Sequence, residues 1–378
     1  MDFELSEELQ LIRSTARDFA QSEVAVTAGA RDREHRFPLE EFRKAAELGF
    51  AGMLVPESFG GTALGTLALA IVIEEVSCAC ASTGVTLSVH NSLVTSPIVR
   101  HGTPAQQEAW LPRLATGELL GAYALSEANA GSDAAALQCK AARDGAGWRL
   151  NGTKLWITSG NEADLMIVFA RAPEGITAFL VPTDAPGFSV GKVEEKLGIR
   201  SSSTVEVVLD GVRLPAEAVL GEAGKGLRVA FDTLDGGRIG IAAQALGIAQ
   251  ASLDASVRYA GQREQFGQSI ARFQAVQFKI AQVSADLAAA RLACWRAAWL
   301  RDRARPHTLE AAQAKLVSSQ VANRAADEAV QIHGGAGYTT EFPVARYFRD
   351  ARITEIYEGT TEVQKLVIAR SLLGGKPT

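Results

Sequence analysis

The chain has 378 residues and a formal net charge of −5, with 47% hydrophobic and 21% charged residues. This length exceeds the size at which one hydrophobic core usually stops growing, so we expect two or three consecutive substructures. The composition is that of a soluble globular protein. The negative net charge gives no reason to expect nucleic acid as a partner, because phosphate binding needs a basic face.

The cysteines and the N-terminus indicate the compartment. Four cysteines, Cys78, Cys80, Cys139 and Cys294, form no Cys-x-x-Cys pair and have no histidine close by in sequence. This pattern favours buried thiols in a reducing compartment over a zinc site or a disulfide framework. The N-terminus shows no basic-then-apolar leader, and the longest apolar run, Leu67 to Ile73, is too short to cross a bilayer. We therefore expect a cytoplasmic protein with no membrane partner and no bound metal.

Residues 1–119 show the spacing of helices. Apolar residues recur at helical intervals after Ser6, a residue type suited to cap a helix N-terminus. A second helix is predicted to open at Pro38 and to end near Gly49, and a buried helix is predicted around Leu67 to Val76. These signals predict an N-terminal α-helical domain.

Residues 120–226 change to the alternating pattern of strands, and turn residues become frequent. The Asn151-Gly152 pair within Trp148 to Ile157 predicts a hairpin of two short strands. Further strands are predicted at Leu165 to Ala170, Ile176 to Val181 and Thr204 to Leu209. A central antiparallel β domain follows from this pattern.

Residues 227–378 return to long helical patterns. Three long helices are predicted, covering Ile239 to Tyr259, Phe273 to Arg303 and Leu309 to Ile332. Their apolar and alanine positions keep helical spacing over many turns, which is typical of a four-helix bundle. The predicted fold class is α+β, with three consecutive domains at 1–119, 120–226 and 227–378.

One stretch near the C-terminus attracts attention as a candidate catalytic site. Thr361 and Gln364 have capping-box spacing, which predicts a helix start at Thr361 and places Glu358 in the turn before it. Gly359 permits an unusual backbone angle, and the amides of the coming helix point toward whatever binds there. A structural interpretation is also open, because acidic residues are common at helix N-termini, where the helix dipole favours them.

Several standard sites are excluded. Gly334 to Gly337 follows a predicted helix rather than a strand, so it is not a dinucleotide-binding fingerprint, and Gly221 to Leu227 lacks the Lys-Ser/Thr pair of a P-loop. The sequence contains no Gly-x-Ser-x-Gly elbow and no His-Glu-x-x-His motif. No motif in the sequence therefore supports a hydrolase or an NAD-dependent dehydrogenase.

The run Tyr357-Glu358-Gly359-Thr360, followed by Glu362-Val363-Gln364 and preceded by Arg349-Asp350-Ala351, resembles the C-terminal signature of the acyl-CoA dehydrogenases. The chain is most similar to the short-chain members, notably in Gly237 to Ala242 and Ala245 to Gln250. The resemblance implies the three-domain fold of that family and FAD-dependent conversion of a short or branched-chain acyl-CoA to its trans-2-enoyl-CoA. Glu358 would remove the α-proton, its main-chain N–H would bind the thioester carbonyl, and electrons would pass to electron-transfer flavoprotein.

Two further stretches resemble the flavin-binding segments of the family. Tyr123 to Asp133 is similar to the segment that holds the flavin, which assigns Tyr123, Leu125, Ser126, Gly131 and Ser132 to FAD, and Ser132 also to the acyl-CoA. Ala128 stands where the family usually has proline, which loosens the turn. Trp156, Ile157 and Thr158 match the strand that packs on the isoalloxazine ring. A sheet-core role is the structural alternative for Trp156.

The resemblance assigns the remaining site residues to CoA and to FAD shared between subunits. Asp235 and Arg238 lie in a segment similar to the lining of the CoA channel, with a charge pair at a helix N-terminus as the structural alternative, and Gly359 is assigned to substrate. The residues implied for FAD binding are Arg263, Phe266, Gln274, Gln331, Gly334, Gly335, Thr360 and Glu362. The Arg263 to Gln274 and Gln331 to Gly335 groups would reach the FAD of a neighbouring subunit. We therefore expect a homotetramer built as a dimer of dimers. His333 receives no role.

Two other functions stay open at this point. A flavin-dependent oxidase or monooxygenase could use the same scaffold, although the presence of Glu358 disfavours a monooxygenase and the short C-terminus disfavours the longer acyl-CoA oxidases. A non-catalytic CoA-binding protein could keep the helical bundle without a flavin. Bound flavin colour would separate the enzymes from the binding protein.

Overall fold

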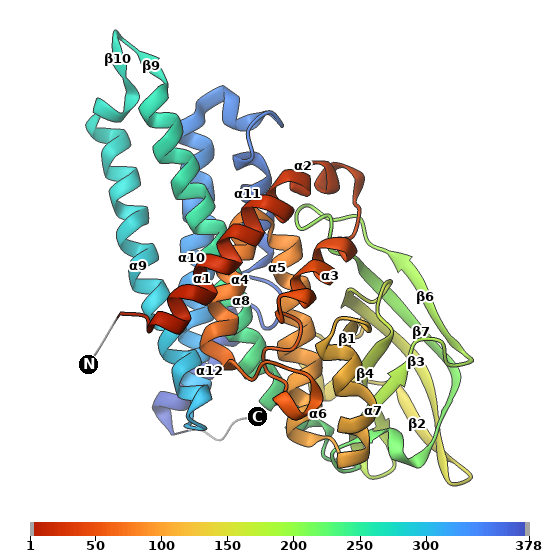
Figure 1. Ribbon diagram of the computed structural model, residues 1–378. Coiled ribbons are helices and arrows are strands. Elements are labelled where there is room, and N and C mark those ends of the chain that lie inside the picture. The colour runs from red at the N-terminus through yellow and green to blue at the C-terminus, as the bar shows by residue number, and fades with distance from the viewer. Residues whose placement is uncertain (1–3, 375–378) are drawn as a thin grey trace.

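A computed structural model describes residues 4–374 and confirms the predicted fold class of three consecutive parts, helical, β and helical (Figure 1). The first part begins where Ser6 caps α1, its hydroxyl accepting a hydrogen bond from the Leu9 amide at 3.3 Å. Its helices are α1 (Glu7–Phe19), α2 (Ala25–Glu34), α3 (Leu39–Glu47), α4 (Gly65–Ala79), α5 (Ala81–Ser88), α6 (Ser96–His101) and α7 (Pro104–Ala115). The exact domain boundaries of the sequence analysis stay predictions.

The central part is one twisted sheet with the strand order β6-β7-β3-β2-β4-β5-β8, and β1 pairs with β4 in parallel. Apart from β1 and a single parallel bridge between β2 and β4, the neighbouring strands are antiparallel. The strands are β1 (Gly121–Ala124), β2 (Lys140–Asp144), β3 (Gly147–Thr158), β4 (Leu165–Ala172), β5 (Gly175–Pro182), β6 (Phe188–Val193), β7 (Thr204–Leu214) and β8 (Val219–Leu220). The strands predicted near 165, 176 and 204 are thereby confirmed.

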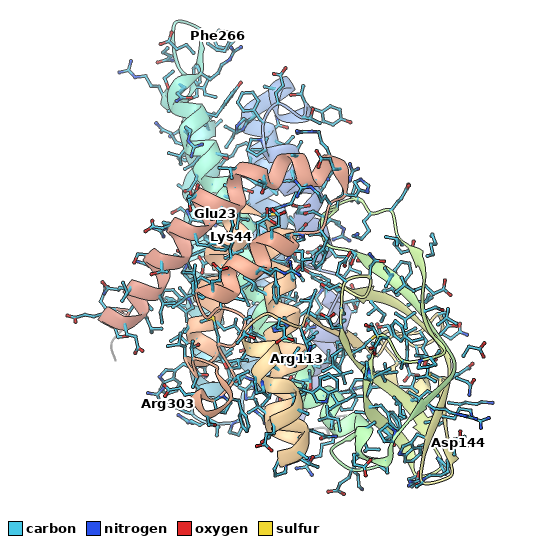
Figure 2. All side chains as sticks on the ribbon, turned by 45° about the vertical axis from the view of Figure 1, so that its right-hand side comes forward. Glu23, Lys44, Arg113, Asp144, Phe266 and Arg303 are labelled. Carbon is cyan, nitrogen blue, oxygen red and sulfur yellow. The ribbon has the colours of Figure 1, made fainter. Side chains whose placement is uncertain are left out.

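The predicted hairpin at Asn151-Gly152 is wrong. These residues lie inside β3, which runs unbroken between β2 and β7 and has a register shift between Leu150 and Asn151 where it pairs with β7. Gly152 has a φ of 151°, and a Cβ atom there would lie 2.8 Å from the Cα atom of Cys139. The glycine therefore permits a bulge and a close approach of Cys139, the residue before β2, rather than a turn. The turn of this hairpin instead follows Asp144, at the tip of the sheet in Figure 2.

The third part is built on three long helices that lie side by side (Figure 1): α8 (Gly226–Gln262), α9 (Gln274–Asp302) and α10 (Thr308–His333). The short strands β9 (Glu264–Gln265) and β10 (Gln268–Ser269) join α8 to α9, and α11 (Val344–Ile353) and α12 (Thr361–Leu373) complete the part. Helix α8 begins well before the predicted start at Ile239, because Gly236 and Gly237 pack closely against neighbouring side chains and this packing outweighs their low helix propensity.

Helix α8 connects the three parts. It packs against α4 and α5 of the first part, against β5 of the sheet, and against α9 and α10. Almost every residue from Asp235 to Ala249 is buried, which explains why the segment lacks a polar face. Across the described residues, 4–374, no helix has both the length and the apolar character that a membrane crossing requires.

Candidate active site

Glu358 lies in a left-handed turn between α11 and α12. Its φ is 50° and that of Gly359 is 93°. Left-handed φ is uncommon for a residue with a side chain and costs free energy, so the surrounding structure must enforce it. The sequence analysis placed the helix start correctly, but the N-cap is Thr360, whose hydroxyl accepts a hydrogen bond from the Val363 amide at 3.4 Å. The predicted capping box of Thr361 and Gln364 is therefore wrong by one residue.

The Glu358 carboxylate reaches into the protein and touches α8. Its Oε2 atom is buried and has no hydrogen-bond partner among residues 4–374. A Cβ atom built on Gly237 would lie only 1.9 Å from this Oε2 atom, and 2.9 Å from Cδ2 of Leu93. Any side chain at position 237 would thus displace the carboxylate. Gly237 therefore joins the candidate site, although the sequence analysis assigned it no role there.

Electrostatics keep the Glu358 carboxyl group close to the midpoint of its titration at neutral pH. Burial raises its pKa to about 7, while the positive charges of Lys315 and Arg238 oppose this shift. The hydroxyl of Tyr123 is also buried without a partner in the described chain, and burial together with the Glu358 charge holds its pKa well above the usual range. A carboxyl group of this kind can accept and release a proton near pH 7, which suits general acid–base chemistry.

The two predicted flavin-binding segments are tied together. The Leu155 amide donates a hydrogen bond to the Ser126 carbonyl at 2.9 Å, so the loop after β1 lies against β3. Glu127 fixes the same loop, because its carboxylate accepts hydrogen bonds from the Gln138 and Cys139 amides at 2.6 and 3.0 Å and from Lys154 at 2.7 Å. These hydrogen bonds fix the loop immediately before Ala128.

Trp156 projects outward from a bulge. Its φ is 63°, the register of β3 against β7 shifts between Lys154 and Ile157, and its side chain is 60% exposed. The interpretation of Trp156 as a sheet-core aromatic is therefore wrong, and Ile157 takes the buried position instead. Gly131 and Ser132 are exposed as well. An outward-facing indole offers a surface for the flat ring of a flavin, and backbone strain of this kind is typical of functional sites.

Asp235 and Arg238 form an ion pair inside α8, with Nη1 of Arg238 at 2.6 Å from Oδ1 of Asp235. Thr308 also donates a hydrogen bond to Asp235, at 2.5 Å. The structural alternative of a helix N-terminal charge pair is wrong, because α8 begins at Gly226. Both residues are largely buried, and Nε of Arg238 has no partner within residues 4–374, so the pair can still bind a ligand.

Six of the remaining predicted FAD residues form a second group at the far end of the bundle (Figures 1 and 2), whereas Thr360 and Glu362 lie at the start of α12. Phe266 lies at the tip between β9 and β10 and is 93% exposed. Arg263 ends α8, and the ring of Tyr259 one turn earlier stacks on His333 at 4.1 Å between ring centroids. This stack joins the end of α8 to the end of α10. The group gathers Arg263, Phe266, Gln274, Gln331, Gly334 and Gly335 from the end of α8, the start of α9 and the end of α10, and Figure 1 shows this end of the bundle away from α12.

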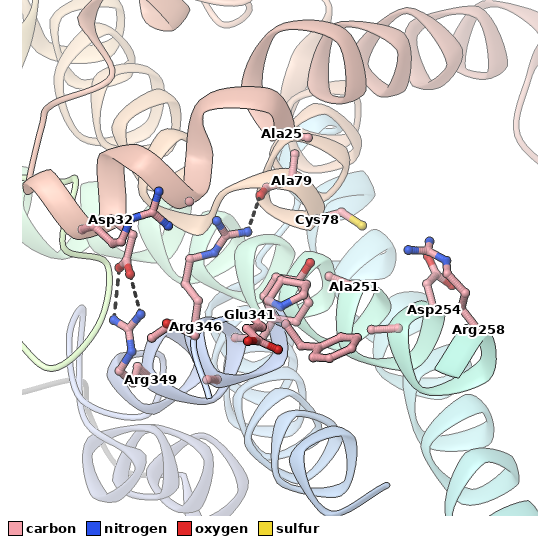
Figure 3. A pocket seen from close by; sticks show the side chains of 18 of the residues that line it. Ala25, Asp32, Cys78, Ala79, Ala251, Asp254, Arg258, Glu341, Arg346 and Arg349 are labelled. Atoms are coloured by element: carbon pink, nitrogen blue, oxygen red, sulfur yellow. Dashed lines mark hydrogen bonds and ion pairs between the residues drawn. The ribbon is translucent and has the colours of Figure 1, made fainter. Parts of the chain in front are cut away.

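Two pockets open elsewhere on the surface. One of about 180 Å³ is lined by Arg352, Glu355, Ile356, Thr360, Thr361 and Glu362, two of which are predicted FAD residues. A larger pocket of about 430 Å³ lies between α2, α4, α8 and α11 (Figure 3). There Arg349 pairs with Asp32, and Arg346 donates a hydrogen bond to the Ala79 carbonyl at 3.1 Å. None of the predicted site residues lines this larger pocket.

Comparison with known proteins identifies the family. Family models match the acyl-CoA dehydrogenase N-terminal domain over residues 6–118, the middle domain over 122–212 and the C-terminal domain over 224–373. The chain belongs to the acyl-CoA dehydrogenase family. Members are flavin-dependent oxidoreductases, so the prediction of an enzyme of this class is confirmed, as is the similarity to its short-chain members.

Relatives of this acyl-CoA dehydrogenase match over nearly their whole length. The mitochondrial short-chain specific acyl-CoA dehydrogenase of Mus musculus is 51% identical over 375 residues, covering 98% of this chain and 91% of that protein. The solved structure of butyryl-CoA dehydrogenase from Megasphaera elsdenii is 44% identical, with a TM-score of 0.97 over 99% of this chain and 100% of that chain. A chain in a structure described as the electron transferring flavoprotein of Acidaminococcus fermentans is 43% identical, with the same TM-score and coverage.

The structure adds two more residues to the site of this acyl-CoA dehydrogenase. Lys315 on α10 donates a hydrogen bond to the Gly359 carbonyl at 2.7 Å, and Gln364 on α12 donates to the same carbonyl at 2.9 Å. Both side chains are fully buried. One sequence feature could have indicated Lys315. It is a lysine among the alanines and serines of a buried helix face, and burying a lysine costs free energy unless it has a polar partner. Gln364 carried a misleading signal, since its spacing suggested a capping box.

Proposed function

We propose that this chain catalyses FAD-dependent α,β-dehydrogenation of a short or branched-chain acyl-CoA to its trans-2-enoyl-CoA, with Glu358 as the base that removes the α-proton. The observation that carries the proposal is the environment of Glu358. Its buried Oε2 atom lacks a partner within residues 4–374 and lies against Gly237, and burial raises its pKa to about 7. Removal of a weakly acidic α-proton needs a positioned base of this kind.

The chain's own groups would orient the thioester for this step. The left-handed turn presents the Glu358 main chain beside its own carboxylate, so its N–H is proposed to donate a hydrogen bond to the thioester carbonyl and to stabilise the negative charge that develops there. The buried Asp235–Arg238 pair is proposed to contribute to CoA recognition. Ser132, in the exposed loop after β1, and Gly359 are proposed to contact the acyl-CoA.

FAD is the flavin that we propose for this site. When bound, FAD supplies the acceptor for the hydride that leaves the β-carbon. The residues that would hold its ring are Tyr123, Leu125, Ser126, Gly131, Ser132, Trp156, Ile157 and Thr158, and Thr360 and Glu362 would hold a neighbouring part. The outward position of Trp156 and the orphan Tyr123 hydroxyl support this assignment.

The second group of predicted FAD residues supports a shared cofactor. Arg263 follows α8, Phe266 lies between β9 and β10, and Gln331 is near the end of α10. Because Figure 1 shows this end of the bundle opposite α12, these residues are proposed to complete the FAD site of a neighbouring subunit. The proposed assembly is a homotetramer built as a dimer of dimers. An electron-transferring flavoprotein is the proposed electron acceptor, which the likeness to the Acidaminococcus fermentans structure supports. The cytoplasmic location stays a prediction.

Close packing beside α8 supports a short acyl group. Three residues after the glycine that faces Glu358, Gly240 lies so near α5 that a Cβ atom there would be 2.1 Å from Oγ of Ser88. One turn further, the fully buried Gln244 accepts a hydrogen bond from the hydroxyl of Tyr357. These contacts fall within about 10 Å along the helix from the carboxylate. They are proposed to close the interior against long acyl chains.

Anaerobic titration of the purified yellow protein tests the proposal. Butyryl-CoA, isobutyryl-CoA, 2-methylbutyryl-CoA and octanoyl-CoA are added in turn while the visible flavin band is followed. We expect bleaching by a short acyl-CoA, little bleaching by octanoyl-CoA, and return of the colour with electron-transferring flavoprotein. A flavin-containing protein that none of the four bleaches would contradict the proposed substrate class.

The Glu358→Gln variant tests the base. It keeps the size of the side chain and removes the basic oxygen, so we expect the yellow colour to be retained and substrate-dependent flavin reduction to fall by about 1,000-fold or more. Unchanged reduction in this variant would refute the role of Glu358. A colourless protein that cannot be reconstituted with FAD would refute the dehydrogenase and favour a CoA-binding protein.

A further inference from the structure

Lys315 is a fully buried lysine on α10. Its neighbours on the buried face of the helix are small, namely Ala311, Ala312, Ala314, Ser318 and Ser319. Within residues 4–374, Lys315 forms no ion pair with the nearby carboxylates of Glu355, Glu358 and Glu362. Burying an ammonium group without a paired carboxylate costs free energy, so other polar groups must stabilise it.

The hydrogen bond of Lys315 goes to the turn that carries Glu358. Its Nζ atom donates to the Gly359 carbonyl at 2.7 Å. Gln364 donates to the same carbonyl at 2.9 Å and to the Glu358 carbonyl at 3.4 Å. Two buried side chains from different helices thus bind the carbonyl groups of the two left-handed residues, Glu358 and Gly359. Charged hydrogen bonds are stronger than neutral ones, so Lys315 provides the firmer contact.

Several charged and titratable groups surround Glu358 and Lys315. Glu358 faces Lys315 on α10, Arg238 on α8 and Tyr123 on β1, and Tyr357 is its neighbour in sequence. Lys315 in turn faces Glu358, Arg238, and the carboxylates of Glu355 and Glu362, which flank the turn. The Lys315 ammonium group therefore makes a direct hydrogen bond to the Gly359 carbonyl. It acts on the Glu358 carboxylate only through the electrostatic attraction between their charges.

We propose that Lys315 is a positioning residue for Glu358: it holds the Gly359 carbonyl so that the turn stays left-handed with the carboxylate against Gly237, and its charge favours the ionised carboxylate. This inference rests on the proposed function, since it assigns a purpose to Lys315 through the base. The turn needs such support because left-handed φ at Glu358 costs free energy that local sequence does not supply.

Three substitutions separate the hydrogen bond from the charge. Lys315→Met removes both, Lys315→Gln keeps a donor without charge, and Lys315→Arg keeps a donor and the charge. Lys279→Met is the matched control, because Lys279 pairs with Glu328 between α9 and α10 and has no part in the proposed site. Each protein is purified with FAD, its flavin content and thermal midpoint are measured, and the pH profile of kcat/KM for butyryl-CoA is recorded.

Loss of the positive charge should raise the pKa of Glu358, because a nearby cation favours the ionised carboxylate. We expect the acid limb of the kcat/KM profile of Lys315→Met and Lys315→Gln to move upward by about one pH unit, which at pH 7 lowers kcat/KM by about fivefold through ionisation alone. Lys315→Met should lose about a further tenfold because the turn is released. Lys315→Arg and Lys279→Met should keep the wild-type limb.

The outcomes distinguish the possible failures. A lower thermal midpoint with an unmoved acid limb in both neutral variants would show a merely structural lysine and overturn the inference. If Lys315→Met does not fold, the comparison of Lys315→Gln with Lys315→Arg still decides, because the two differ in charge. If Glu358→Gln retains full turnover, the proposed function fails first. If Glu358→Gln is inactive and all Lys315 variants match wild type, only this inference fails.

Discussion

Replacing Gly237 by alanine should displace the carboxylate of Glu358, the proposed base, without changing the residue itself. A Cβ atom at position 237 would lie 1.9 Å from Oε2 of Glu358 and 2.9 Å from Cδ2 of Leu93. Gly237 is in the middle of α8, which is packed on several sides and cannot move away easily. The Glu358 carboxylate must therefore retreat.

The size of the effect follows from the geometry. Ordinary van der Waals contact requires that the carboxylate move by about 1.5 Å. A misplacement of about 1 Å in a catalytic group costs about 100-fold in rate, so we expect Gly237→Ala to lower the rate of flavin reduction by about 100-fold. Stability should change little, because the gain of about 1 kcal/mol from alanine in a helix offsets part of the repacking cost.

The assay is stopped-flow flavin reduction by butyryl-CoA under anaerobic conditions, with flavin content and thermal midpoint measured on the same preparations. Gly261→Ala is the matched control on the same helix, since no heavy atom lies within 4 Å of a Cβ atom built there. We expect the control to reduce its flavin at the wild-type rate. Wild-type reduction by Gly237→Ala would show that the carboxylate does not need its observed position, and the argument from packing would be refuted.

Two further predictions concern pH and stability. Because burial raises the pKa of Glu358 to about 7 and only the carboxylate can act as the base, kcat/KM for butyryl-CoA should fall about tenfold per pH unit below pH 7; an acid limb below pH 5 would contradict this assignment. Arg349 donates two hydrogen bonds to the largely buried Asp32 and so joins α11 to α2. Arg349→Leu should lower the free energy of unfolding by about 3 kcal/mol, measured by urea denaturation, because it leaves a buried charge unpaired. The double variant with Asp32→Leu should recover part of that loss, and an equal or greater loss in the double variant would contradict the argument.

The predictions that depended on regular periodicity succeeded. Helices α9 and α10 lie within one or two residues of their predicted bounds, because apolar positions repeat at helical spacing along their whole length. Strands β4, β5 and β7 were likewise visible as alternating or apolar runs between turns. In these segments local preference and tertiary packing agree, so the local pattern was sufficient.

The predictions that failed involved glycines and caps, whose meaning depends on what lies next to them. Asn151-Gly152 has the composition of a turn, yet Gly152 lies within β3, where Cys139 approaches too closely for a Cβ atom. The predicted helix at Ile239 to Tyr259 begins too late, because α8 also includes Gly236 and Gly237, where neighbouring side chains occupy the space that a Cβ atom would need. A glycine permits a turn and a close contact equally well, and only the partner decides between them.

The sequence by itself determined the order of helical and β parts, the family resemblance, and the location of Glu358 before a helix. Only the tertiary structure decided what surrounds that carboxylate: Gly237 from α8, Lys315 from α10, Gln364 from α12 and Tyr123 from β1. The physical reason is that periodicity reports short-range geometry, whereas the pKa and position of a buried group depend on burial and charge supplied by residues far apart in the chain.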